Sequence, residues 1–220
     1  MVTLEDVKKS QVLKQYMLSG NEYIGNIGAI EHNMKHAEWT AELCRDILLQ
    51  VGATEREAEL GAIAGYLHDA GNLVNRYGHG LSGAMIAFYV LLDLGMDYEE
   101  IATIMGAIGN HEEKAKGSSV NRVAAALILA DKSDVHRSRV RKRDKSLFTA
   151  RDRVNYAVTR STIKVDKENR RILLLMRIDT RVCSVIEYFE IFLTKMLMCR
   201  RAAAYLGYAF ALIINDHQLL

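Results

Sequence analysis

The sequence predicts a mainly α protein, in which a helical bundle is followed by a small α+β C-terminal part. The chain contains no proline, and apolar residues recur at helical spacing from Leu4 to about residue 136. After a highly charged stretch at 137–153, the sequence becomes rich in β-branched and apolar residues. We therefore place a domain boundary after residue 148, with a helical domain at 1–148 and an α+β subdomain at 149–220.

Capping patterns and glycines divide the helical part. Thr54 with Glu57, and Asp97 with Glu100, offer side-chain acceptors to the unpaired N–H groups of a helix start. Glycines stand where helices are expected to stop, at Gly20, Gly52, Gly71 and Gly95. The expected helices are 4–18, 33–51, 55–70, 81–94, 98–111 and 119–136.

The C-terminal part is expected to form a β-hairpin, a long helix and a further strand. Residues 154–166 and 170–179 are the expected hairpin strands, 181–205 the amphipathic helix, and 207–216 a strand that can pair with the hairpin. The helix carries an apolar stripe of Ile186, Phe189, Phe192, Leu193 and Met196. We favour packing of this stripe against the sheet, and a partner or homodimer interface is the alternative.

Composition limits the classes of function. The 220 residues are half apolar, and 29 basic residues nearly balance 27 acidic ones, so net charge indicates neither nucleic acid nor membrane as a partner. Three widely spaced cysteines without a CxxC pair favour reduced thiols in a cytoplasm. The N-terminus is charged and the late apolar run 202–215 is too short for a bilayer, which favours a soluble, cytoplasmic protein.

Histidines and aspartates fall at the ends of the expected helices. Such ends can gather at one end of a bundle, where imidazole and carboxylate groups bind iron, manganese, zinc or similar divalent ions. A lone histidine at a helix end is usually a cap or a hydrogen-bonded core residue. The candidate ligands at these ends are His36, His68, Asp69, His79, His111 and Asp131.

This order resembles the HD superfamily of metal-dependent phosphohydrolases. The matching residues are His36 in KHAEWTAELC, His68-Asp69 in GYLHDAG and Asp131 in LILADKSD, so the resemblance covers about residues 30–136. The segments HGLSGA at 79–84 and GNHEE at 109–113 resemble the additional ligands of the five-motif members, which bind two metals.

The resemblance implies a dinuclear centre. Asp69 would bridge two ions; His36, His68 and Asp131 would complete one site, and His79 and His111 the other. The expected ions are iron or manganese, with zinc, magnesium, nickel or cobalt as alternatives. Such a pair, about 3.5–4 Å apart, activates water as hydroxide and neutralises charge on phosphate oxygens. The expected reaction is hydrolysis of a phosphoester or phosphoanhydride, foremost of a nucleotide or a nucleotide-derived signal.

The cations that bind the substrate differ from those of many relatives. Those relatives follow the His-Asp pair with a glycine and a lysine, whereas this chain has HDAGN. We expect Lys132 to act with Asp69 in catalysis. The arginines of the charged stretch predict either a phosphate-binding rim or a solvated connection. The expected substrate-binding residues are Asn72, Arg76, Lys132, Arg137, Arg139 and Arg141.

The sequence suggests three other interpretations. A metal-binding regulatory or ligand-sensing module without turnover, acting through the C-terminal part, is the main alternative. Nucleic-acid binding through the basic segment is weaker. The pattern HNMKH resembles a zinc-protease HExxH motif, but Asn33 replaces the glutamate base, which excludes that reading. His136 and His217 are expected to be ordinary surface or structural residues.

Overall fold

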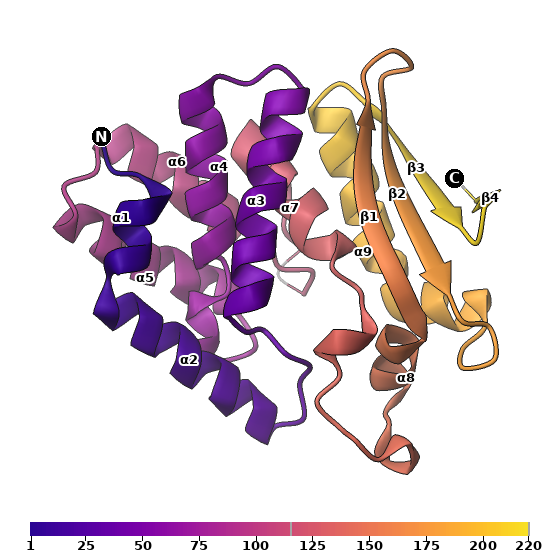
Figure 1. Cartoon of the computed structure of the whole chain (residues 1–220). Helices are drawn as coiled ribbons and strands as arrows, with labels where there is room; N and C mark the ends of the chain where they lie inside the picture. The colour runs from indigo at the N-terminus through magenta and orange to yellow at the C-terminus, as the bar shows by residue number, and fades with distance from the viewer. Residues whose placement is uncertain (115, 220) are drawn as a thin grey trace.

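The computed structural model describes residues 1–114 and 116–219, and its fold is mainly α with a small α+β part at the C-terminus, as predicted (Figure 1). Within the described residues, no helix is both long and apolar enough to cross a bilayer. The helices of the bundle are α1 (Leu4–Lys9), α2 (Gln11–Asn26), α3 (Met34–Gln50), α4 (Glu55–Leu67), α5 (His79–Asp93), α6 (Tyr98–Gly109) and α7 (Arg122–Ser133).

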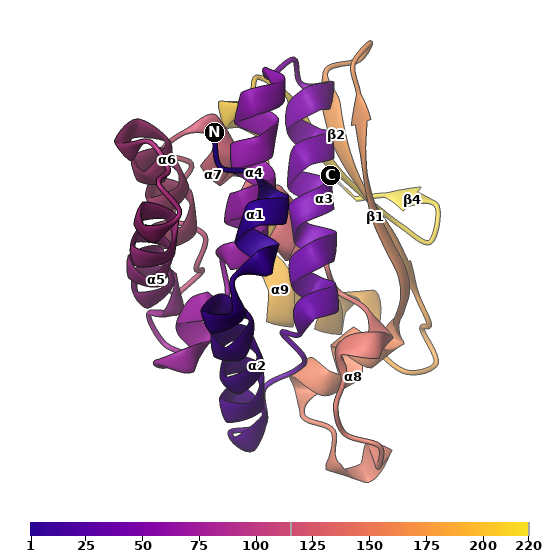
Figure 2. The same cartoon turned by 60° about the vertical axis from the view of Figure 1, so that its left-hand side comes forward.

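Helices α3 and α4 pack side by side at the centre of the bundle, with α5 and α6 on one side and the sheet on the other (Figure 2). Small residues permit the close approach. A Cβ built on Gly65 of α4 would lie 2.8 Å from Cα of Ala41 in α3, so a larger residue would push the helices apart. This packing brings the start of α3 beside the end of α4.

The first predicted helix, 4–18, is wrong in its bounds. The helix is interrupted at Ser10, whose side chain accepts a hydrogen bond from the Leu13 N–H at 3.3 Å and so caps the start of α2. Gly20 does not end a helix but lies inside α2, where a Cβ would lie 2.9 Å from the Leu73 nitrogen. A glycine required for close packing was thus interpreted as a helix end.

Around His68 and Asp69, the observed helix bounds also differ from the predicted ones. Helix α4 ends at Leu67, and a short 3-10 helix, η1 (Ala70–Leu73), contains Gly71. A Cβ at Gly71 would collide with the carbonyl oxygen of His79, so η1 packs directly on the start of α5. That helix begins at His79 rather than at residue 81.

The C-terminal part forms one four-stranded sheet with a helix against it (Figure 1). Its elements are α8 (Ala150–Ala157), β1 (Val158–Asp166), β2 (Arg171–Ile178), α9 (Val185–Tyr205), β3 (Ala209–Ile214) and β4 (His217–Gln218). In the order β1-β2-β3-β4, β1 and β2 are antiparallel and β2 and β3 are parallel. The parallel pair requires a crossover, which α9 provides.

The predicted strand 154–166 begins only at Val158, because its first four residues are helical. Thr149 and Asp152 form a capping box: the Thr149 hydroxyl accepts from the Asp152 N–H at 3.2 Å, and the Asp152 carboxylate accepts from the Thr149 N–H at 2.9 Å. Two 3-10 turns, η2 (Arg137–Arg139) and η3 (Lys145–Leu147), precede it in the charged stretch.

Helix α9 buries only part of its predicted apolar stripe. Phe192 and Met196 belong to the core, as expected, whereas Ile186 and Leu193 are 71% and 52% exposed. The C-terminal part is tied to the bundle by polar contacts as well. The Ser161 hydroxyl donates to the Ser133 carbonyl at 2.6 Å, so β1 is fixed beside the end of α7.

Candidate metal centre

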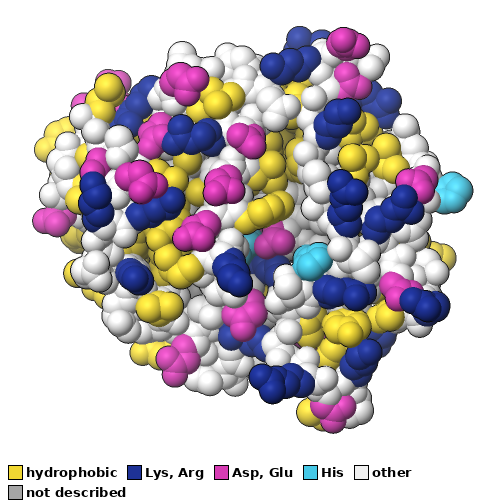
Figure 3. Space-filling model, in the orientation of Figure 1, with side chains coloured by type: hydrophobic (Ala, Val, Ile, Leu, Met, Phe, Trp, Pro, Cys, Tyr) yellow, Lys and Arg dark blue, Asp and Glu magenta, His cyan; other side chains and the backbone are white. Residues whose placement is uncertain are grey.

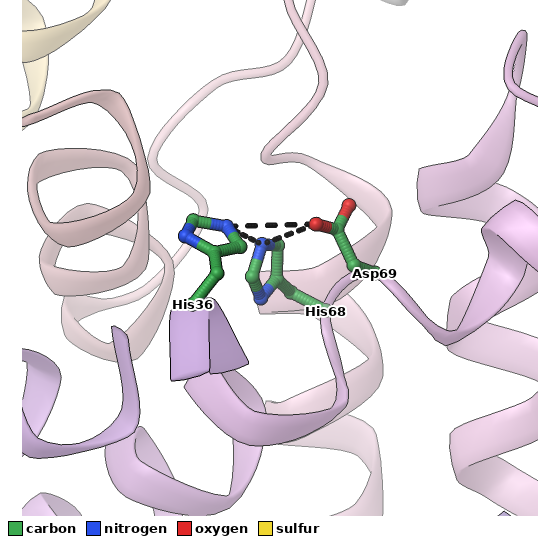
Figure 4. Close-up of side chains that lie close together, drawn as sticks. All are labelled: His36, His68 and Asp69. Carbon is green, nitrogen blue, oxygen red and sulfur yellow. Dashed lines mark hydrogen bonds and ion pairs between the residues drawn. The ribbon is translucent and has the colours of Figure 1, made fainter. Parts of the chain in front are cut away.

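Three of the predicted ligands meet where α3 and α4 lie together (Figure 4). His36 lies in the first turn of α3, because Asn33 caps that helix by accepting from the His36 N–H at 3.2 Å. His68 follows the last residue of α4, and Asp69 comes next, before η1. The helix therefore ends where both side chains can face the same space.

The other three predicted ligands reach the same space from α5, α6 and α7. His79 is the first residue of α5, after Gly78 in a left-handed conformation with φ of +74°. His111 follows the end of α6, and Asp131 lies in the last turn of α7. All six side chains are buried.

The six residues form two histidine pairs around one carboxylate. The Nε2 atoms of His36 and His68 lie 3.2 Å apart, and Asp69 Oδ2 lies 3.5 Å and 3.2 Å from them. The Nε2 atoms of His79 and His111 lie 3.0 Å apart, and the other oxygen of Asp69, Oδ1, lies 3.4 Å from His79 Nε2. Asp69 thus presents one oxygen to each pair.

Asp131 joins the first pair. Its Oδ1 lies 3.5 Å from His36 Nε2 and 3.7 Å from His68 Nε2. Three overlapping sets of ligand atoms, all within 4.8 Å of one another, can hold a metal ion: His36, His68 and Asp69; His68, His111 and Asp131; and Asp69, His79 and His111.

The hydrogen bonds of the imidazoles show that this cluster fits cations. Each Nδ1 faces an acceptor that carries no proton, so in the neutral rings Nδ1 is the protonated nitrogen and Nε2 carries a lone pair. Facing lone pairs at these distances repel unless a cation lies between them. Asp69 Oδ2 is also buried without a hydrogen-bond partner among the described residues. The Nδ1 acceptors are Asp134 Oδ2 for His36 at 2.6 Å, the Gly65 carbonyl for His68 at 2.7 Å, the Arg76 carbonyl for His79 at 3.0 Å and the Ile108 carbonyl for His111 at 2.6 Å.

The ionisation states of the clustered side chains also favour a cation in this cluster. Burial opposes ionisation of Asp69 and Asp131, but the attraction of His68 for Asp69, and of Lys132 for Asp131, holds the pKa of each carboxyl well below its usual range. Burial also opposes protonation of His68, yet the two carboxylates raise its pKa to about 10, so without a metal ion a second proton, on Nε2, supplies the positive charge there. The cluster therefore stabilises positive charge at its centre.

Further polar residues hold the ligands in place. Asn72 donates to Asp69 Oδ1 at 2.9 Å, so this predicted substrate-binding residue orients a ligand. Asp134 and Glu112 were missed by the sequence reasoning. Asp134 accepts from His36, and Glu112 accepts from the N–H groups of Gly78 and Gly80 at 3.2 and 3.3 Å. Their positions, three residues after one ligand and directly after another, were the signal that could have identified them.

A cavity of about 210 Å³ lies against the cluster. Of the predicted cations, Arg76, Lys132 and Arg139 line it. Lys132 donates to Asp131 Oδ2 at 2.7 Å, and the attraction of Asp131 and Glu113 outweighs burial and raises the Lys132 pKa. A protonated amine therefore lines the cavity beside a predicted ligand.

The two remaining arginines lie elsewhere. Arg137 packs over the Tyr156 ring, 5.1 Å from its centroid. Arg141 donates to the carbonyl oxygens of Ala29 and Asn21 at 2.9 and 2.8 Å, which ties the charged stretch to the end of α2. Both guanidinium groups thus have structural contacts away from the cavity.

Several residues that line the cavity were not predicted. His32 lies before α3 rather than on it, donates to the Ile30 carbonyl at 2.8 Å and has its pKa lowered by burial. Tyr77, Arg151 and Lys195 also line the cavity. The last two come from the C-terminal part, and no pattern in the sequence places them near the histidines.

A second cavity, of about 460 Å³, lies on the other side of Arg139 and is lined by His36, Trp39, Asp134 and His136, among others. Figure 3 shows histidine side chains near the centre of the face drawn there, among acidic and basic ones, over the junction of bundle and sheet. His136 is therefore a cavity residue, although its ring also bonds to Ser138 at 2.8 Å.

Comparison with known proteins adds no family to this picture: the chain matches no protein-family model and no curated protein.

Proposed function

We propose that the protein is a metal-dependent phosphohydrolase of the HD type, which hydrolyses a phosphoester or phosphoanhydride, foremost of a nucleotide or nucleotide-derived signal. One observation carries the proposal. Two histidine pairs, each with facing Nε2 atoms, share the two oxygens of a single buried carboxylate, Asp69.

The donor set suits two divalent ions. Imidazole nitrogens with carboxylate oxygens favour iron, manganese, zinc and similar first-row ions. The residues that would hold them are those of the two histidine pairs together with Asp69 and Asp131. When bound, such a pair of ions lowers the pKa of water and neutralises charge that develops on phosphoryl oxygens.

The protein's own cations suit the binding of a phosphoryl group beside the cluster. Lys132 lines the cavity, is buried and is protonated, so its ammonium can donate to a phosphoryl oxygen while Asp131 keeps it in place. Arg76 lines the same cavity, and its Nη1 donates to Asn72 Oδ1 at 3.0 Å. In the reaction, water oxygen attacks phosphorus and the bond to the leaving oxygen breaks; of the two water protons, one ends on the leaving oxygen and the other stays with the phosphate product.

Metal content and turnover test the proposal together. The purified protein is analysed for bound metal, then loaded with manganese and offered phosphoesters, nucleotides and dinucleotides. We expect turnover that a chelator abolishes and that is lost in Asp69→Asn. The matched control is Asp46→Asn, because Asp46 is exposed on α3. Turnover by Asp69→Asn at the wild-type rate would contradict the proposal.

Thermal unfolding gives a readout that does not require a substrate. An ion that binds only the folded state stabilises it by about 2.7 kcal/mol at 100 times its Kd. For a chain of this size, that corresponds to a rise in Tm of about 5–10 °C. We expect such a rise with manganese in the wild type and in Asp46→Asn, and none in Asp69→Asn.

The second candidate is a metal-binding regulatory module that acts through its C-terminal part. The exposed Ile186 and Leu193 on α9 favour it, because apolar side chains exposed on one helix can bind a partner. Metal binding without turnover of any compound in the panel is the result that would support this candidate over the enzyme.

A further inference from the structure

Lys195 is a buried lysine that reaches the cavity from the C-terminal part of the chain. It lies on α9, is only 7% exposed, and lines the same cavity as Asp69 and Asp131. The cluster ligands all belong to the bundle, so the cavity lies between the two parts of the molecule.

The ammonium of Lys195 makes no direct ion pair among the described residues, although the charges of Glu113 and Asp131 favour its protonated form. Among residues 1–114 and 116–219, no hydrogen bond or ion pair engages it, and it lies over the Phe192 ring, 4.5 Å from the centroid. Burial is the main cause that lowers its pKa, to about 8. A desolvated cation without a partner is costly, so a structural role alone does not explain a lysine here.

The other buried cations of the cavity are paired. Lys132 donates to Asp131, and Arg139 lies 3.2 Å from Asp134 Oδ2. Both cations therefore have a direct carboxylate partner before a ligand arrives, whereas Lys195 has none among the described residues.

Arg151 is a second cation that lines this side of the cavity and makes no ion pair among the described residues. It lies at the start of α8, is exposed, and stacks over the same Phe192 ring at 5.3 Å from the centroid. Among the described residues, its guanidinium makes no ion pair. Phe192 thus holds two cations beside the cavity, and both belong to the C-terminal part.

We propose that Lys195 and Arg151 form a second anion-binding subsite, which takes a phosphate or similar anionic group of the substrate other than the group that reacts at the cluster. The substrate class is therefore a compound with at least two phosphate groups, such as a nucleoside polyphosphate or a bisphosphorylated nucleotide. That the other group reacts at the cluster rests on the proposed function; binding at Lys195 does not.

Non-hydrolysable diphosphonates test the subsite directly. The binding of methylphosphonate, methylenediphosphonate and propane-1,3-diphosphonate is measured by calorimetry on manganese-loaded protein freed of excess metal. Two spacings are used so that one can match the span between cluster and subsite. The variant is Lys195→Met, which keeps an apolar stem on Phe192, and the matched control is Lys164→Met, because Lys164 is exposed on β1.

In the wild type and in Lys164→Met, at least one diphosphonate should bind about tenfold or more tightly than methylphosphonate. In Lys195→Met this advantage should disappear, while the affinity for methylphosphonate stays within about twofold, because a desolvated charge pair is worth at least this much. Equal binding of both diphosphonates by the wild type and Lys195→Met would overturn the subsite.

Stability provides a second readout. Removing a desolvated, unpaired charge should raise the Tm of Lys195→Met above that of the wild type in the absence of ligand. A lower Tm would show that the ammonium supports the fold and would contradict the proposal.

Lysine-dependent diphosphonate binding without turnover of any phosphoester would reject the proposed function and retain the subsite. Metal-dependent turnover without lysine-dependent diphosphonate binding would reject the subsite and retain the proposed function.

Discussion

The histidine cluster has two halves, a first half with His36 and His68 and a second half with His79 and His111. Their ligand atoms are arranged alike, but the residues that hydrogen-bond to the histidines differ. In both, two Nε2 atoms face each other and one oxygen of Asp69 lies beside them. In the first half, Asp134 accepts from His36 and Asp131 adds a second carboxylate. In the second half the Nδ1 acceptors are main-chain carbonyls, and Arg76 Nη1 lies 3.4 Å from His79 Nε2.

This difference indicates unequal affinity for cations. The first half has more carboxylates at its ligands, and a carboxylate behind a histidine makes the imidazole a stronger ligand. In the second half a guanidinium stands beside a ligand nitrogen and opposes a cation there. We therefore expect the half with His36 and His68 to bind its ion more tightly than the half with His79 and His111.

The largest expected effect is that of Asp69→Asn, because it removes charge from both halves at once. We expect loss of both ions after gel filtration, measured by elemental analysis, with helical content retained in circular dichroism. The loss of affinity should exceed the roughly 10–100-fold that is typical of a residue outside the ligand set. Full metal content in this variant would show that Asp69 is not shared by two ions.

A smaller effect is expected for His79→Gln, which alters only the weaker half. This variant should keep the ion of the first half and lose the second, so its metal content should fall to about half that of the wild type. His217→Gln is the matched control, because His217 is exposed on β4. Loss of all metal in His79→Gln would mean that the halves do not bind independently.

Asp134→Asn should weaken only the first ion, by roughly 10–100-fold, since the change affects the residue behind His36 and not a ligand. Titration with manganese, followed by calorimetry, would detect one step moved to higher concentration and the other unchanged. A shift of both steps would contradict the assignment of Asp134 to one half.

The smallest effect is expected for Glu112→Gln. Glu112 Oε2 lies 3.4 Å from His79 Nδ1, but that nitrogen already donates to the Arg76 carbonyl at 3.0 Å. The second ion should weaken less than about tenfold, below the range expected for Asp134→Asn. If Glu112→Gln weakened the binding of the second ion as much as Asp134→Asn weakens that of the first, Glu112 would matter to its half as much as Asp134 does to the other.

The fold class could be predicted from the sequence because helical periodicity and caps follow local rules, whereas the grouping of the six residues followed from their order, which resembles that of the HD superfamily. Asn33 and Thr54 begin helices whose ends place His36 and His68 together. The strand predicted at 154–157 was wrong because the β-branched composition was weighed above the Thr149–Asp152 capping box. Gly20 was misread because only tertiary packing shows what lies against it.

The cavity wall could not be predicted for a similar reason. Lys195 lies 64 residues after Asp131 in the numbering, and its place depends on how α9 packs against α7. Asp134 is a different case. It follows Asp131 by three residues, so a search for polar partners of the ligands could have found it.

Stoichiometric manganese titration of the wild type, alongside His36→Gln and His79→Gln, measures whether the histidine cluster holds two ions. We expect about two ions per chain that bind in two steps, with the tighter step lost in His36→Gln and the weaker step lost in His79→Gln. A wild type that binds no manganese, or a single ion that both variants lose alike, would contradict this expectation.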